Sequence, residues 1–169
     1  LLCGGCSALN VQAPTAQITA ANLGKVDTEG FMMDFTVELA NPNSVPLPLT
    51  AMEYAFSLGS AKVLDGAIQP GGSLPASDKR TVQVPLRLTY TNLLSAEQVV
   101  RSSGWNIPYA LNGGLSFDSG SPMVGKLRVP VNHSGTLPLK ELIDHPMMLL
   151  ESPSARKLAE WAAQSLISK

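Results

Sequence analysis

An alternation of apolar and polar residues with a period of two restricts most what this chain can fold into. Over residues 31–39 every second residue is large and apolar, and the pattern returns at 52–58 and 82–90. Successive side chains of a strand point to opposite faces of its sheet, so each segment predicts a strand with one face in a core. Pro85 cannot donate to a strand ladder, which places the third strand at an edge or at a bulge.

Four shorter stretches bring the expected number of strands to seven, and clusters of Gly, Pro, Asn and Ser separate them. One helix is expected among them, because Ser95 with Gln98 three residues later fits a capping box and Gly104 suits a helix end. This order favours a mainly β fold, an antiparallel β-sandwich of about seven strands with one crossover helix. The shorter strands are expected at residues 17–23, 62–68, 105–117 with a break at Gly113–Gly114, and 123–131.

A second helix is expected near the C-terminal end of the chain. Ser152 followed by Pro153 is a typical cap and first-turn pair, and the helix would run from residue 153 to 167. Apolar residues would then gather on one face of it. They are Leu158, Trp161, Ala162 and Leu166.

The chain therefore divides into a tether at residues 1–15, a sandwich domain at 16–138 and an appendage at 139–169. The apolar face of the last helix predicts packing on the chain's own domain, or else contact with a partner chain or a membrane surface. Met147 and Met148, in the apolar stretch before the helix, are further candidates for such a contact.

Composition excludes some classes of function. Twelve basic and thirteen acidic side chains give a formal net charge of −1, whereas a protein that binds nucleic acid needs clustered Lys and Arg. No apolar run reaches the roughly 18 residues that a membrane-spanning helix requires. We therefore expect neither nucleic-acid binding nor a transmembrane helix.

Side chains that could carry chemistry are few. The candidates for a catalytic group are His133 beside Ser134 and His145 beside Asp144, and neither pair lies in a motif such as G-x-S-x-G. We expect His133 in a solvent-facing turn after the last strand. The sequence thus predicts no enzyme activity, no cofactor, no metal site and no small-molecule substrate.

Both cysteines lie within the first six residues, so no disulfide is predicted inside the domain. Gly4 and Gly5 before Cys6 resemble a bacterial lipobox, although Cys3 stands where that motif usually carries Leu, and the apolar start fits a shortened export signal. The alternative, a redox or metal pair, lacks further ligands nearby. The resemblance implies a lipid on Cys6 and a place on the periplasmic side of a bacterial envelope; Ser7 favours the outer membrane.

The first long strand runs directly into Asn41-Pro42-Asn43, and a proline-containing segment at 45–49 follows. This order resembles the WHy domain of type-2 late embryogenesis abundant (LEA) proteins over about residues 16–138. The resemblance implies a fibronectin-like sandwich that protects against desiccation or other stress by shielding client proteins or surfaces, without catalysis. Further segments that carry it are residues 54–59, Gly66, 73–76, 82–86, 104–109, 125–130 and Gly135.

Two questions stay open at this point. The amides of Asn41 and Asn43 could order water and contact clients, or they could end a strand and turn the chain. The whole protein could be a lipid-anchored protective module whose partners are the membrane and its clients. Alternatively, it could be a structural or adaptor subunit of an envelope assembly that docks through its C-terminal helix.

Overall fold

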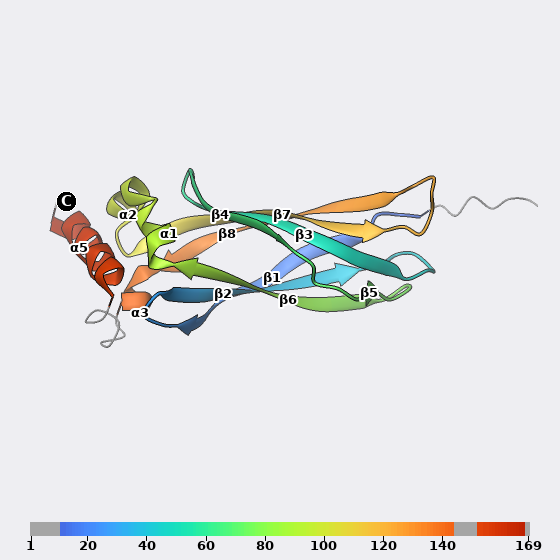
Figure 1. Cartoon of the computed structure of the whole chain (residues 1–169), viewed down its shortest axis with the longest axis horizontal. Helices are drawn as coiled ribbons and strands as arrows, with labels where there is room; N and C mark the ends of the chain where they lie inside the picture. Colours follow the sequence, from blue (N-terminus) through green and yellow to red (C-terminus); the bar gives the residue numbers. More distant parts are fainter. Residues whose placement is uncertain (1–10, 144–151, 168–169) are drawn as a thin grey trace, which may run out of the picture.

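The computed structural model describes residues 11–143 and 152–167. Two antiparallel sheets pack face to face, as the sequence predicts (Figure 1). One sheet has the order β1-β2-β6 and the other the order β4-β3-β7-β8, with β5 paired to β3. The strands are β1 (Thr15–Val26), β2 (Gly30–Ala40), β3 (Leu47–Leu58), β4 (Ala61–Ile68), β5 (Ser73–Leu74), β6 (Lys79–Thr89), β7 (Asn106–Asp118) and β8 (Lys126–Pro138).

The core lies between the sheets and follows the predicted alternation. Phe35 and Phe56 are fully buried, and Val84, Leu86 and Leu88 of β6 are at most 2% exposed. Tyr54 is the exception, because its side chain is only half-buried. It lies beside β4, the edge strand of the wider sheet, and its ring covers Gly66, where an added Cβ would come within 2.8 Å of the Tyr54 hydroxyl.

The prediction for the last two strands needs correction. β7 continues through Gly113–Gly114 without a break, and β8 covers 126–138 rather than 123–131. Gly114 is buried because the Arg128 side chain crosses it to reach Glu53, with Nη2 2.6 Å from Oε2. A side chain at position 114 would block this crossing, so the glycine makes room on the sheet instead of ending the strand.

Two short helices follow β6, where one was predicted. These are α1 (Tyr90–Leu94) and α2 (Glu97–Ser103), and α2 ends at Gly104 as expected. The capping box is not Ser95 with Gln98: α2 has no side-chain cap. Instead the Thr89 hydroxyl accepts from the backbone N–H of Asn92, and the side-chain Oδ1 of Asn92 accepts from the backbone N–H of Thr89.

β6 is an edge strand, which confirms the prediction from Pro85. It pairs with β2 alone, and the register runs without interruption from Gly30↔Thr89 to Ala40↔Lys79. Pro85 lies opposite Asp34 in this ladder. Because proline has no N–H to give, its nitrogen faces the open edge.

The two ends of the sandwich differ, and Figure 1 shows them at opposite ends of its long axis. The turn pole, as we call it, consists of residues 11–14 and the loops 41–46, 69–78 and 119–125. The helical pole consists of α1, α2, α3 (Leu139–Ile143) and α5 (Pro153–Ile167). There α5 packs against α1 and α2.

Candidate functional site

The Asn41 side chain lies buried at the turn pole, where β2 ends. Its Nδ2 donates to the carbonyl oxygens of Val45 at 2.8 Å and Pro75 at 2.9 Å. Its Oδ1 accepts from the backbone N–H and from Nδ2 of Asn43, at 3.0 and 2.8 Å. One amide thus holds the β2–β3 turn closed and ties it to the loop that follows β5.

Asn43 extends this network to the entry of the chain. Its Oδ1 accepts from the Gln12 N–H at 2.7 Å, its Nδ2 donates to the Gln12 carbonyl at 2.8 Å, and its own carbonyl accepts from the Ser77 N–H at 2.8 Å. Pro42 between the two asparagines is exposed. Both amides are therefore engaged inside the fold, which is the arrangement that the structural interpretation of this motif expects.

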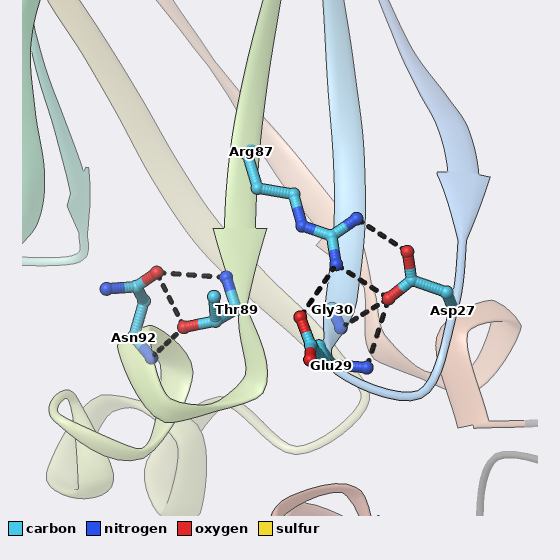
Figure 2. Close-up of polar contacts among 6 residues, drawn as sticks. All are labelled: Asp27, Glu29, Gly30, Arg87, Thr89 and Asn92. Carbon is cyan, nitrogen blue, oxygen red and sulfur yellow. Dashed lines mark hydrogen bonds and ion pairs between the residues drawn. The ribbon is translucent and has the colours of Figure 1, made fainter.

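A second polar cluster, at the helical pole, joins Arg87 of β6 to the β1–β2 turn (Figure 2). The two Arg87 Nη atoms bind the two Asp27 carboxylate oxygens at 2.7 and 2.6 Å. Asp27 Oδ1 also accepts from the N–H groups of Glu29 and Gly30. The hydrogen bonds from Arg87 and from this backbone hold the pKa of Asp27 well below its usual range.

Sequence reasoning missed this cluster for a clear reason. The local half, an Asp followed three residues later by Gly, is a readable turn signal. The other half, Arg87, lies 60 residues away from Asp27 and meets it only once β2 and β6 pair. Both side chains remain about one-third exposed, so the pair links two elements at the surface.

His133 does not lie in a solvent-facing turn, and this prediction was wrong. β8 continues past Val131, so His133 points inward, half-buried, with its ring 6.1 Å from the Phe35 ring and 6.0 Å from the Tyr109 ring. Ser134 is exposed on the opposite face of the same strand, so the two side chains do not form a catalytic pair. Asp144 and His145 lie outside the described residues.

The apolar face of α5 packs on the chain's own domain. Leu158 and Ala162 are fully buried, and Trp161 is 5% exposed. Arg101 of α2 and Lys157 lie over the Trp161 ring, 5.0 and 5.2 Å from its centroid. The candidate anchor, Cys6, lies outside the described residues, as do the candidate contact residues Met147 and Met148. The side chain of Leu166 is also outside what the structure describes.

Neither metal ligands nor membrane spans emerge from the described part of the chain. Within residues 11–143 and 152–167, no three His, Cys, Asp or Glu side chains come together as a metal site would require. In the same ranges, no helix combines the length and the apolar character needed to cross a bilayer.

An open hollow on the outer face of the wider sheet is lined by charged and amide side chains. Ligand pockets are usually enclosed and mostly apolar, so this hollow has the character of a hydrated surface rather than of a substrate site. Residues that line it include Glu53, Lys62, Asn112, Arg128 and Asn132.

The protein is thus a small antiparallel β-sandwich in which the polar motif residues Asn41 and Asn43 form hydrogen bonds within the fold. The chain belongs to the late embryogenesis abundant protein family LEA_2, whose model matches residues 36–135. This confirms the resemblance to type-2 LEA proteins. Among its relatives is a desiccation protectant protein, the Lea14 homolog of Glycine max, 29% identical over 135 residues that cover 80% of this chain and 87% of the relative.

Two further comparisons agree with this placement. Late embryogenesis abundant protein Lea14-A of Gossypium hirsutum is 30% identical over 135 residues, again 80% of this chain and 87% of the relative. The solution structure of AT1g01470 from Arabidopsis thaliana superposes with a TM-score of 0.62 at 25% identity, and covers 80% of this chain and 88% of its own. Of these relatives, the Glycine max protein is the one named for desiccation.

Proposed function

We propose that this chain protects client proteins or surfaces against damage on water loss, without catalysing a reaction. The observation that carries the proposal is its membership in the late embryogenesis abundant family together with its similarity to a relative named a desiccation protectant. The geometry is compatible with such a role, because the motif amides and the one described histidine are engaged in packing and hydrogen bonding. We assign the sandwich to the WHy type within that family.

The protective surface in this proposal is the outer face of the wider sheet. Small, hydrated side chains such as those of Asn112, Asn132 and Ser134 alternate there with the buried residues of β7 and β8. Such a surface stays solvated at high concentration and offers no large apolar patch to a client. It can keep client molecules apart as water is withdrawn.

The proposal includes an anchor at Cys6, on the periplasmic side of a bacterial outer membrane. The two small residues before Cys6 support it. The partners are then the membrane, through the lipid, and the clients. Mass spectrometry of protein from the native envelope tests this part: an acylated N-terminal Cys6 is expected, and a Cys6 peptide with a free thiol contradicts it.

The alternative, an adaptor that docks through its C-terminal helix, has less support. Leu158 and Trp161 would have to be available to a partner, and both are buried on α1 and α2. Docking would need other residues of α5.

Drying tests protection directly. Lactate dehydrogenase is dried and rehydrated with the chain, with an equal mass of serum albumin, or with a Phe35→Asp variant. The aspartate puts a carboxylate at a fully buried position and should unfold the sandwich. The variant otherwise has the same amino-acid composition as the parent. We expect several-fold more recovered activity with the folded chain than with either control. Recovery no better than with albumin would contradict protection, and equal recovery with the unfolded variant would remove the role of the fold.

A further inference from the structure

The tip of the β7–β8 loop carries an exposed apolar pair. Met123 is 96% exposed and Val124 is 40% exposed. In the described part of the chain, the other large apolar side chain that is exposed is Ile167, at 86%, on α5 at the opposite pole. These two neighbouring apolar side chains lie in the loop at the end of the β7–β8 hairpin, beyond the faces of the two sheets.

Several backbone N–H groups of this tip donate hydrogen bonds within the loop. The Gly125 and Val124 N–H groups donate to the Ser121 carbonyl at 2.8 and 3.2 Å, and the Ser119 N–H donates to the Gly125 carbonyl at 3.2 Å. The Gly120 N–H donates to Asp118 Oδ1 at 2.9 Å. Placing a turn in a less polar medium costs less when most of its N–H groups are already bonded within it than when they are free.

The position of the tip adds a second argument. It lies at the turn pole, where residues 11–14 lead into β1, and β1 packs beside β8 (Figure 1). Exposed Lys126 follows the tip and can extend its ammonium group toward lipid phosphates. Asp118, the acidic group at the base of the loop, directs its carboxylate to the Gly120 N–H.

We propose that Pro122, Met123 and Val124 insert into the lipid surface to which the chain is attached. The inference rests on the proposed anchor at Cys6 and deepens it, because it adds a second, rigid contact with the same bilayer. A lipid on a chain terminus fixes position but not orientation. With the tip inserted, the turn pole faces the membrane and the helical pole points away from it.

The test supplies the anchor chemically, so it does not depend on natural acylation. The full chain with Cys3→Ser is coupled through Cys6 to a maleimide lipid in phosphatidylethanolamine–phosphatidylglycerol vesicles, with or without brominated acyl chains, which quench tryptophan by contact. One variant carries Met123→Trp and the matched control carries Ile167→Trp. Trp161, in α5, and Trp105, next to α2, provide a built-in reference at the helical pole. Thermal unfolding checks that both variants fold as the parent does.

We expect the emission added by Met123→Trp to shift to shorter wavelength on coupling and to fall several-fold in the brominated vesicles. The emission from Ile167→Trp and from the native tryptophans should change little. Two results would overturn the proposal: no quenching at position 123, or equal quenching at 123 and 167, which would mean that the domain tumbles freely on its tether. Neither result would bear on whether Cys6 is acylated in the cell.

Discussion

The two poles of the sandwich are closed by different kinds of interaction. At the turn pole, two buried asparagines bind backbone groups of three segments. At the helical pole, apolar side chains of α5 cover α1 and α2, and a partly buried ion pair joins β6 to a turn. The loops are therefore held in place by a few hydrogen bonds, whereas the helices are held by buried apolar area. Substitutions should consequently lower stability in different ways at the two poles.

The core between the poles sets the reference for that comparison. Phe35 is fully buried, so Phe35→Ala removes a ring from the centre of the sandwich. We expect a loss of about 3–5 kcal/mol in the free energy of unfolding, measured with denaturant. A loss below about 1 kcal/mol would mean that the neighbouring side chains collapse into the space left by the ring.

At the helical pole, Trp161→Ala tests whether buried area holds α5 in place. We expect a loss of about 3 kcal/mol, at the lower end for a large aromatic residue because part of the ring is covered by the exposed side chains of Arg101 and Lys157 rather than by core residues. Ile167→Ala on the same helix is the control, and its 86% exposed side chain predicts a change within about 0.5 kcal/mol. A loss for Trp161→Ala as small as that for Ile167→Ala would show that the buried ring contributes little to stability.

At the turn pole, Asn41→Ala tests the hydrogen-bond network. It removes the donor for the Val45 and Pro75 carbonyls and the acceptor for Asn43, and we expect a loss of about 2–3 kcal/mol. Exposed Pro42→Ala should cost less than about 1 kcal/mol. Asn41→Asp keeps the acceptor oxygen and loses the donor. If this variant were as stable as the parent, the hydrogen bonds that Asn41 donates would not contribute to stability.

The smallest expected effect concerns pH. The lowered pKa of Asp27 means that its contribution to stability is fully present above the ordinary carboxyl value of 3.8 and is lost as pH falls toward the folded-state value. Asp27→Asn should therefore flatten the acid limb of a plot of stability against pH below about pH 4 and lower stability slightly at pH 7. Glu29→Gln, whose carboxylate lies 3.9 Å from Arg87 and is 84% exposed, is the control and should leave the profile unchanged.

The alternation of β2, β3 and β6 could be predicted because it depends on neighbours in sequence. The same rule extended β6 one residue too far: Tyr90 is buried, as the pattern requires, but it begins α1. Burial there raises the Tyr90 pKa to about 12. A buried residue at the junction of a strand and a helix fits both the two-residue period of the strand and the 3.6-residue period of the helix. The sequence alone therefore cannot place the boundary.

The contacts that close the poles could not be predicted. Asn41 binds Pro75 from 34 residues away, and the Arg87 guanidinium binds Asp27 from 60 residues away. Each of these contacts forms only once segments that are distant in sequence have been brought together by strand pairing. The glycines at 113–114 show the same limit, because a local rule makes them a break, whereas in the fold Gly113 lies against the backbone of Glu53 and Gly114 against the Arg128 side chain, both on neighbouring strands.

Drying changes the concentration of a protein far more than it changes its fold. Contact between two open strand edges is a second-order process, so its rate grows with the square of concentration and becomes most dangerous as the last water leaves. Pro85 removes a donor near the middle of the β6 edge, so a second chain cannot complete a ladder there. In the protective role proposed for this chain, the missing donor at Pro85 hinders edge-to-edge pairing as the protein becomes concentrated.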